Sequence, residues 1–195
     1  MLDIKKYIGV IWGLMLAVTL MGCMASEPDQ TVEEILDRTY QEIKVESHSI
    51  NREGRLGVQM AAKKKNNPKG ENLSPALNFE PVEGASCYAI YMIDKTAHNW
   101  LHWRVTVMEA KSLEEGTFKD VKEYIGPYPP KGKDHSYQIE VYALKELPSQ
   151  TIGKMDASNS YVKMVKALDE TNGSTGNILG YGTIMGYYRQ GDTNK

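Results

Sequence analysis

The stretch Cys87-Tyr88-Ala89-Ile90-Tyr91-Met92-Ile93 is the most apolar run of the chain after its N-terminal segment. An unbroken apolar run of this length is typical of a β-strand that is covered on both faces. Asp94 follows directly, so a carboxylate stands where this strand is expected to end. The run therefore predicts the central strand of a layered structure.

Two later stretches alternate between apolar and polar residues, which predicts strands with unequal faces. In the range 102–108, Trp103, Val105 and Val107 fall on one face, and His102, Arg104 and Thr106 on the other. In the range 137–144, Tyr137, Ile139, Val141 and Ala143 oppose Gln138, Glu140 and Tyr142. Short strands with proline-rich joints favour a β-sandwich or a similar layered sheet.

Two segments have helical spacing. The first begins at Thr31-Val32-Glu33-Glu34, which resembles a capping box, and its apolar face is Val32, Ile35, Leu36, Tyr40 and Ile43. The second places Ser158, Tyr161, Val162, Val165 and Leu168 on one face, and Asn172-Gly173-Ser174 ends it. We expect both helices to pack against the sheet.

Two further segments are less regular. The range 52–70, with Lys63-Lys64-Lys65, has few apolar residues and predicts an exposed loop, either solvated or touching anionic lipid head groups. The range 178–188 carries Gly180, Gly182 and Gly186 between large apolar residues, so its backbone can approach its neighbours closely. Its periodicity assigns neither a helix nor a strand.

The chain has 195 residues, of which 41% are hydrophobic and 25% charged, with a formal charge of −2. This composition fits a globular domain and gives no basic field for nucleic acid, so we expect no nucleic-acid partner. The two cysteines, Cys23 and Cys87, are too few for a disulfide scaffold or a multi-cysteine metal site. We expect Cys87 to be a buried, inert thiol.

The N-terminal segment has the features of an export signal. Lys5-Lys6 precedes the apolar run 7–20, and Leu20-Met21-Gly22-Cys23 resembles the bacterial lipobox. The pattern predicts a lipoprotein signal peptide over 1–22, lipidation of Cys23, a tether over 23–30 and one domain over 31–195. It places the protein in the bacterial cell envelope, anchored to a membrane and facing outside the cytoplasm. The alternative is an ordinary N-terminal anchor helix with an incidental cysteine.

Two of the four histidines stand at the starts of predicted strands. His102 opens one strand, and His135 lies two residues before the other, after a proline-rich turn. If those strands are neighbours, both histidines converge beside Asp94. Imidazoles and a carboxylate between aromatic walls suit a small anion such as phosphate, but they are also metal-ligand types. The third interpretation is a pair of histidines with purely structural roles.

Several blocks of the sequence resemble one family. They are Gly70-Glu71-Asn72-Leu73-Ser74-Pro75-Ala76-Leu77-Asn78-Phe79, Asp94, Trp100-Leu101-His102-Trp103, residues 124–137 (YIGPYPPKGKDHSY), and the closing segment from Ile178 to Arg189. In order and spacing they resemble the phosphatidylethanolamine-binding protein family, in particular its bacterial Raf kinase inhibitor-like branch. The resemblance extends over about residues 43 to 190.

The resemblance implies a mainly β, two-sheet antiparallel β-sandwich-like fold with a few peripheral helices. It also implies a pocket for phosphate-like or phospholipid head-group ligands, without a cofactor or metal, lined by Asp94, Trp100, His102, Gly126, Pro129, Pro130, His135 and Tyr137. The histidines would donate to the ligand, and Asp94 would orient them. Family members often carry a cis peptide here, for which Tyr128-Pro129 and Pro129-Pro130 are the candidates.

The chain departs from the family pattern at two places. The usual Asp-Pro-Asp-Ala-Pro run appears here as Asp94-Lys95-Thr96-Ala97-His98, and Phe79 stands where tryptophan is usual. Lys95 or His98 could add positive charge beside the anion pocket, or either could point into solvent.

Three functions are compatible with the sequence. The leading hypothesis is a non-enzymatic, lipid-anchored binding protein of the cell envelope that recognises an anionic group through His102 and His135. The second is an inhibitor or modulator of an envelope protein, which requires a protein partner. The third is a histidine-dependent or metal-assisted hydrolase, although no Gly-x-Ser-x-Gly motif or activated cysteine accompanies the histidines.

Overall fold

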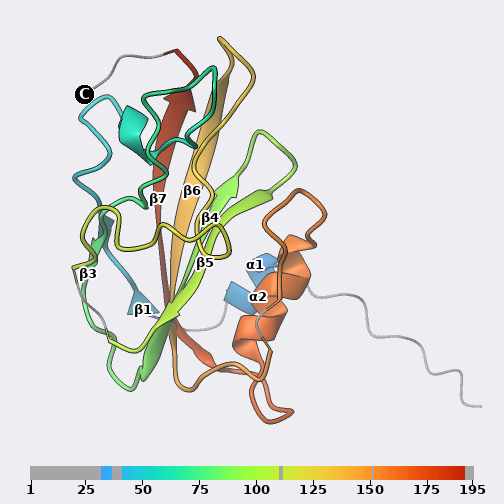
Figure 1. Ribbon diagram of the computed structural model, residues 1–195. Coiled ribbons are helices and arrows are strands. Elements are labelled where there is room, and N and C mark those ends of the chain that lie inside the picture. Colours follow the sequence, from blue (N-terminus) through green and yellow to red (C-terminus); the bar gives the residue numbers. More distant parts are fainter. Residues whose placement is uncertain (1–31, 37–40, 110–111, 151, 192–195) are drawn as a thin grey trace, which may run out of the picture.

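The computed structural model describes residues 32–36, 41–109, 112–150 and 152–191 (Figure 1). In chain order the elements are α1 Val32–Leu36, β1 Gln41–Glu42, β2 Val45–Glu46, the 3-10 turn η1 Val58–Met60, β3 Asn78–Phe79, β4 Cys87–Asp94, β5 Trp100–Val107, β6 Asp134–Leu144, α2 Tyr161–Asp169 and β7 Ile178–Arg189. The predicted signal peptide, Cys23, the tether and Thr31 lie outside the described residues. Of the helices in the described ranges, none is long and apolar enough to cross a membrane.

Strand β4 is buried along its whole length, as its apolar run predicts. Tyr88, Ile90 and Met92 belong to a cluster that also contains Val45 and Phe79 of the second sheet, here called the sheet-side cluster. The intervening residues of β4 belong to a second cluster under α1 and α2, here called the helix-side cluster. The strand therefore separates two cores.

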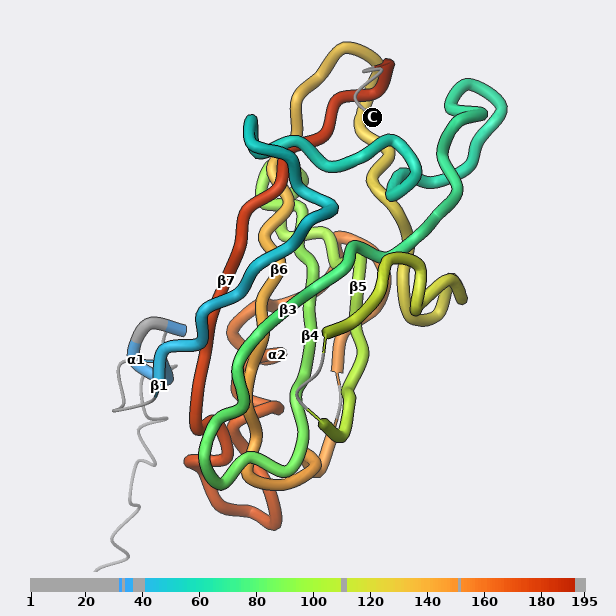
Figure 2. The backbone as a smooth tube through the Cα atoms, turned by 90° about the vertical axis from the view of Figure 1, so that its left-hand side faces the viewer, coloured from blue at the N-terminus to red at the C-terminus, as the bar shows by residue number. Residues whose placement is uncertain are grey.

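The main sheet has the order β1-β7-β6-β4-β5, and a small sheet pairs β2 with β3. All pairings are antiparallel except that of β1 with β7. Figure 1 shows both helices on one side of the main sheet and β3 on the other, and Figure 2 shows β3 in front of β4 and β6 with α2 behind them. The mainly β, two-sheet fold with few helices is confirmed.

A β-bulge in β5 corrects one face assignment. Met92 pairs with Trp103, whereas Ile93 pairs with Leu101, so His102 is an extra residue between the two pairs. Leu101 packs in the helix-side cluster and Trp103 in the sheet-side cluster. His102 is directed toward Tyr137 of the sheet-side cluster, and not to the face opposite Trp103 as strict alternation predicts. In β6 the predicted alternation holds.

The first predicted helix is shorter than its spacing indicates. Val32, Ile35 and Leu36 are buried in the helix-side cluster as expected. Ile43, however, follows β1 and packs in the sheet-side cluster, because its backbone N–H donates to the carbonyl of Tyr181 in β7 at 2.9 Å. Tyr40 lies outside the described residues. The second helix forms as α2, with Ser160 as its N-cap, so Ser158 precedes it.

The range 52–70 is not the fully exposed loop that its composition predicts. Lys63, Lys64 and Lys65 are exposed, but Met60, Ala61 and Asn67 are buried. The loop backbone lies directly against residues 124–127 because Gly126 has no Cβ to meet it, and the Ala62 N–H donates to the Pro127 carbonyl at 3.1 Å. This packing places part of the loop beside the candidate site described below.

The glycine-rich closing segment forms β7, an inner strand of the main sheet. A Cβ at Gly182 would lie 1.9 Å from the carbonyl oxygen of Ile43, and one at Gly186 would lie 2.8 Å from Leu56. The close backbone approach expected from the glycines is therefore present.

A buried carboxyl group, Glu140, lies in β6 beneath the start of α2. It accepts hydrogen bonds from the Tyr142 hydroxyl at 2.9 Å, the Tyr161 hydroxyl at 2.5 Å and the Gln138 amide at 2.9 Å. The Lys95 ammonium lies 4.8 Å from the centroid of the Tyr161 ring. Burial raises the pKa of Glu140 to about 7, although these donors and the charge of Lys95 favour the ionised form.

Glu140→Gln is expected to reduce the pH dependence of stability. Because the pKa of Glu140 is about 7 when folded and about 4.5 when unfolded, ionisation favours unfolding as the pH rises through this window. The free energy of unfolding of the parent should fall relative to that of the variant by about 2–3 kcal/mol between pH 5 and pH 8. Urea denaturation of both proteins across this range measures the difference. A constant difference at every pH would contradict the prediction.

Candidate functional site

Three strand ends meet at one edge of the main sheet. Strand β4 is antiparallel to both β5 and β6, so its last residue, Asp94, pairs with Trp100 on one side and with Tyr137 on the other. The strands that carry His102 and His135 are not direct neighbours, because β4 lies between them. The two histidines still converge on one site, because Asp94, at the end of the central strand β4, lies between them. His135 itself lies within β6 and does not precede it.

Asp94 holds both His135 and the turn that follows β4. Its Oδ2 lies 2.7 Å from Nδ1 of His135, and its Oδ1 accepts the backbone N–H groups of Thr96 at 2.8 Å and Ala97 at 3.0 Å. The carboxylate is almost completely buried. Because Nδ1 of His135 donates to Asp94, the orientation of the ring is fixed and Nε2 is left for a ligand.

His102 is fixed in a similar way by a backbone carbonyl. Its Nδ1 lies 2.7 Å from the carbonyl oxygen of Ile125, and a carbonyl only accepts, so Nδ1 carries the proton. Burial lowers the pKa of His102, and the nearby His135 adds to this effect, while the Ile125 carbonyl and Asp94 oppose it. In the neutral ring Nε2 is an acceptor, so His102 must bind a second proton before Nε2 can donate to an anion.

Tyr137 contributes a buried hydroxyl between the two histidines. Its ring centroid lies 5.2 Å from that of His102 and 6.5 Å from that of His135. The Tyr137 hydroxyl lies near the Asp94 carboxylate, which acts on its pKa, but among the described residues no contact of this hydroxyl has hydrogen-bond geometry. Burial raises the pKa of Tyr137, with the negative charge of Asp94 acting in the same direction, so the group keeps its proton. A buried, unpaired O–H donor is costly unless a ligand or water accepts its proton.

These groups open into a pocket of about 590 Å³, which collects all eight residues that the family resemblance places there. Its lining is Ala62, Lys64, Asp94, Ala97, Trp100, His102, Ile125, Gly126, Tyr128, Pro129, Pro130, His135 and Tyr137. Most of the wall is apolar, while the histidines, Asp94 and the Tyr137 hydroxyl provide the polar groups. Trp100 and Tyr128 are each 38% exposed, so they stand at the mouth.

Five further residues line the pocket that were not expected from the sequence: Ala62, Lys64, Ala97, Ile125 and Tyr128. Ile125 and Tyr128 are in the 124–137 block that carries the family resemblance, and that block signals them. Lys64 has no such signal, because only the packing of its loop against residues 124–127 brings it to the pocket. It adds a third cationic or basic side chain beside His102 and His135.

The altered rim does not change the lining of the pocket directly. Neither Lys95 nor His98 lines it, and both are exposed. Lys95 is directed toward Tyr161 on the helix side, and His98 lies in a turn with a φ of 52°. Phe79 packs in β3 against Tyr88, with ring centroids 5.2 Å apart. The described residues contain no cis peptide bond, so the expected cis bond at Tyr128-Pro129 or Pro129-Pro130 is absent from the structure.

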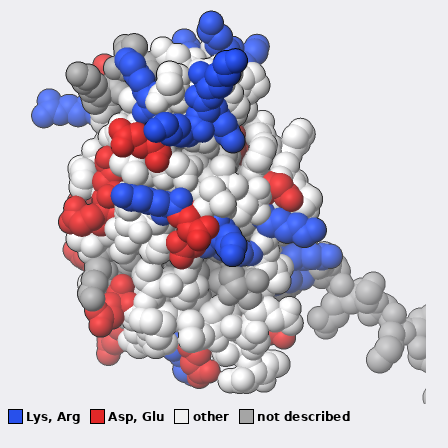
Figure 3. All heavy atoms as spheres, viewed as in Figure 1, with Lys and Arg blue, Asp and Glu red and all other residues white. Residues whose placement is uncertain are grey.

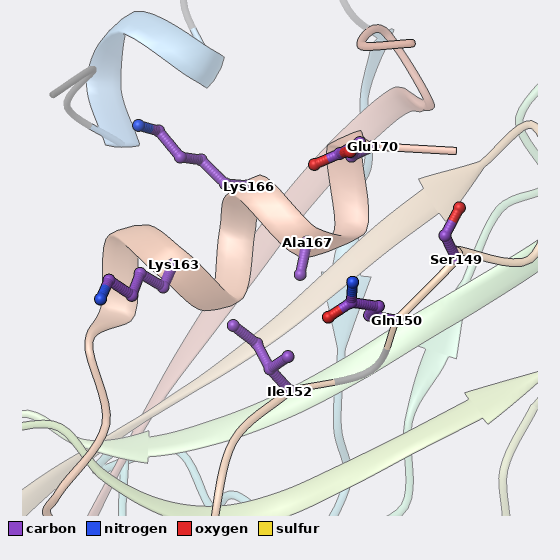
Figure 4. Close-up of a pocket in the computed structure, with 7 residues that line it drawn as sticks. All are labelled: Ser149, Gln150, Ile152, Lys163, Lys166, Ala167 and Glu170. Atoms are coloured by element: carbon purple, nitrogen blue, oxygen red, sulfur yellow. The ribbon is translucent and has the colours of Figure 1, made fainter. Parts of the chain in front are cut away.

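A second hollow, of about 230 Å³, lies between α2 and the segment that carries Ser149, Gln150 and Ile152. Figure 4 shows the ammonium groups of Lys163 and Lys166 pointing away from Gln150 and Ile152. Its polar side chains do not converge in the way that Asp94 and His135 do. Across the described ranges, no group of three or more His, Cys, Asp or Glu side chains is arranged to hold a metal ion.

The described residues thus form a mainly β body with a pocket whose donors and basic groups suit a small anion. The model of the phosphatidylethanolamine-binding protein family matches residues 46–189. The chain belongs to this family.

Two solved bacterial structures share the fold. Escherichia coli YbcL, described as a new member of the mammalian PEBP family, is 24% identical, with a TM-score of 0.55 over 76% of this chain and 98% of its own. The putative phosphatidylethanolamine-binding protein homolog CT736 of Chlamydia trachomatis is 20% identical, with a TM-score of 0.57 and the same coverage. No significantly similar sequence was found among curated proteins.

Proposed function

We propose that the protein is a non-enzymatic, lipid-anchored binding protein of the bacterial cell envelope that recognises phosphate-like or phospholipid head-group ligands. The observation that carries this proposal is the convergence of His102, His135, Lys64 and the unpaired Tyr137 hydroxyl on one pocket. All four can donate hydrogen bonds to an anion, and three can carry positive charge. The apolar walls leave room for a carbon-containing substituent on the anionic group.

The way in which the histidines are held supports binding without turnover. Nδ1 of His135 is hydrogen-bonded to Asp94, and Nδ1 of His102 is hydrogen-bonded to the Ile125 carbonyl. These hydrogen bonds orient the rings, but neither histidine is paired with a nucleophilic side chain. Cys87 is no nucleophile for this pocket, because it lies in the helix-side cluster and burial raises the pKa of its thiol. The ligand is therefore expected to be released unchanged.

Calorimetric titration with sulfate, phosphate and phosphorylethanolamine, in the presence of a chelator, tests the proposal. Sulfate keeps the same charge between pH 5 and pH 8, so its affinity reports only on the protein. Because the pKa of free His102 is lowered and an anion favours the protonated ring, sulfate should bind more tightly as the pH falls, by up to about tenfold per pH unit. Absence of saturable binding to all three anions would overturn the proposal.

The envelope location and the lipid anchor rest on the Leu20-Met21-Gly22-Cys23 motif, and the motif blocks favour the bacterial Raf kinase inhibitor-like branch. Cys23→Ser is expected to abolish incorporation of labelled fatty acid and to release the protein from the membrane fraction of the cells that make it. Unchanged labelling in the variant would contradict lipidation at Cys23. This outcome would leave the anion pocket untouched, since every lining residue lies between 62 and 137.

A further inference from the structure

Six exposed lysines surround the pocket end of the molecule. Lys63, Lys64, Lys65 and Lys69 lie on the loop after η1, and Lys131 and Lys133 lie on the turn before β6; together they are called the basic crown. None of the six forms an ion pair within the described ranges. Figure 3 shows lysine and arginine side chains gathered at this end, although the whole chain has a formal charge of −2.

The two loops of the crown form one continuous surface. The Ala62 N–H donates to the Pro127 carbonyl at 3.1 Å, and the Tyr128 hydroxyl donates to the Asn66 side chain. On one side of this contact Lys64 lines the main pocket. Lys69 and Lys131 line a smaller hollow of about 260 Å³. The crown lysines therefore lie on two loops that contact each other, and one of them, Lys64, lines the main pocket.

Two exposed aromatic side chains line the same pocket as Lys64. Trp100 and Tyr128 are each 38% exposed and both line the pocket mouth. Exposed Trp and Tyr side chains have an apolar body and a polar tip, which suits them to the head-group level of a bilayer. Lysines near an anionic membrane surface each strengthen binding by about fivefold. The combination fits an anionic lipid surface better than a small folded partner.

We propose that the basic crown, with Trp100 and Tyr128, docks the protein on an anionic phospholipid bilayer, so that the pocket mouth faces the head groups. The docking follows from the surface alone; the meeting of the pocket with head groups also rests on the proposed function. The surface shares no residue with the predicted anchor at Cys23. Docking would hold the pocket against the plane of the membrane, whereas an anchor alone would leave its orientation open.

The test uses the chain that begins at Ala25, because the two buried clusters and the helices and strands of the described part of the chain come from residues 32–189. This chain lacks the predicted lipid site and retains two tryptophans, the exposed Trp100 and the fully buried Trp103. Co-sedimentation compares vesicles of phosphatidylcholine with vesicles that contain about 30% phosphatidylglycerol. Brominated lipids in the second vesicles are expected to quench Trp100, and Trp100→Phe should remove this quenching.

Matched lysine variants locate the surface. Lys63→Gln/Lys65→Gln/Lys133→Gln removes three crown lysines that do not line the pocket, and Lys145→Gln/Lys154→Gln/Lys163→Gln removes three exposed lysines elsewhere. The crown variant is expected to bind anionic vesicles roughly 100-fold more weakly than the parent, and the control variant within about threefold of it. Equal binding by the two variants, or no binding by the parent, would overturn the docking proposal.

Sulfate titration of the same proteins separates the two proposals. The crown variant should keep its affinity for sulfate in solution, because Lys64, His102 and His135 are unchanged. Vesicle binding by a parent that binds no sulfate would overturn the anion pocket and support the docking surface. Sulfate binding by a parent that binds no vesicle would support the anion pocket and overturn the docking surface.

Discussion

His135→Ala is expected to weaken phosphate binding by at least about 100-fold. The substitution removes one charge-assisted hydrogen bond to the ligand, which is worth about 1.5–3 kcal/mol. It also removes the partner that lies 2.7 Å from the Asp94 carboxylate, which then accepts only from the N–H groups of Thr96 and Ala97. The carboxylate is then unpaired on the side where the anion binds. Repulsion between Asp94 and the ligand therefore adds to the loss. Calorimetric titration with phosphate measures it.

His98→Ala is the matched control for this prediction. His98 is an exposed histidine four residues after Asp94, and it does not line the pocket. Its removal should leave phosphate affinity within about twofold of the parent. Thermal unfolding of both variants shows whether each is folded under the titration conditions. A folded His135→Ala protein with parental affinity would mean that the pocket is not the anion site.

The strands could be predicted from the sequence because the order of apolar and polar residues indicates which faces of each strand are buried. The unbroken run of β4 predicted two covered faces, and the alternation in β6 predicted which residues meet the second sheet. The bulge at His102 could not be predicted, because it arises from the register between β4 and β5. The predicted first helix is longer than the observed one, because Ile43 fits helical spacing but its backbone instead pairs with β7.

The candidate site was predictable where its residues lie in local motifs. Trp100 and His102 share one block, and Gly126, Pro129 and His135 share another, so a family resemblance reaches them directly. Lys64 depends on packing between segments about 60 residues apart, and a run of three lysines reads as a solvated loop. The course of that loop depends on its close backbone approach to Gly126.

Gly126→Ala is expected to lower the free energy of unfolding by about 3 kcal/mol and to weaken phosphate binding with it. A Cβ at this position would lie 2.2 Å from the carbonyl oxygen of Met60 and 2.6 Å from the backbone nitrogen of Ala62. Those atoms cannot withdraw freely, because the Met60 carbonyl also accepts from the Tyr124 hydroxyl at 2.9 Å. Overpacking against backbone of this kind costs up to about 3 kcal/mol and must displace the segment that leads to Lys64.

Gly132→Ala separates this steric effect from the loss of a glycine as such. Gly132 lies in the same loop with a φ of 74°, and a Cβ there would meet nothing within 4 Å. Its substitution should lower stability by only about 1 kcal/mol, the cost of a left-handed conformation for a residue with a Cβ. Phosphate affinity should not change, because Gly132 does not line the pocket. Urea denaturation and phosphate titration of both variants measure these effects. Equal losses of stability and of phosphate affinity in the two variants would show that the contact between Gly126 and the Met60–Ala62 backbone does not hold the Lys64 loop in place.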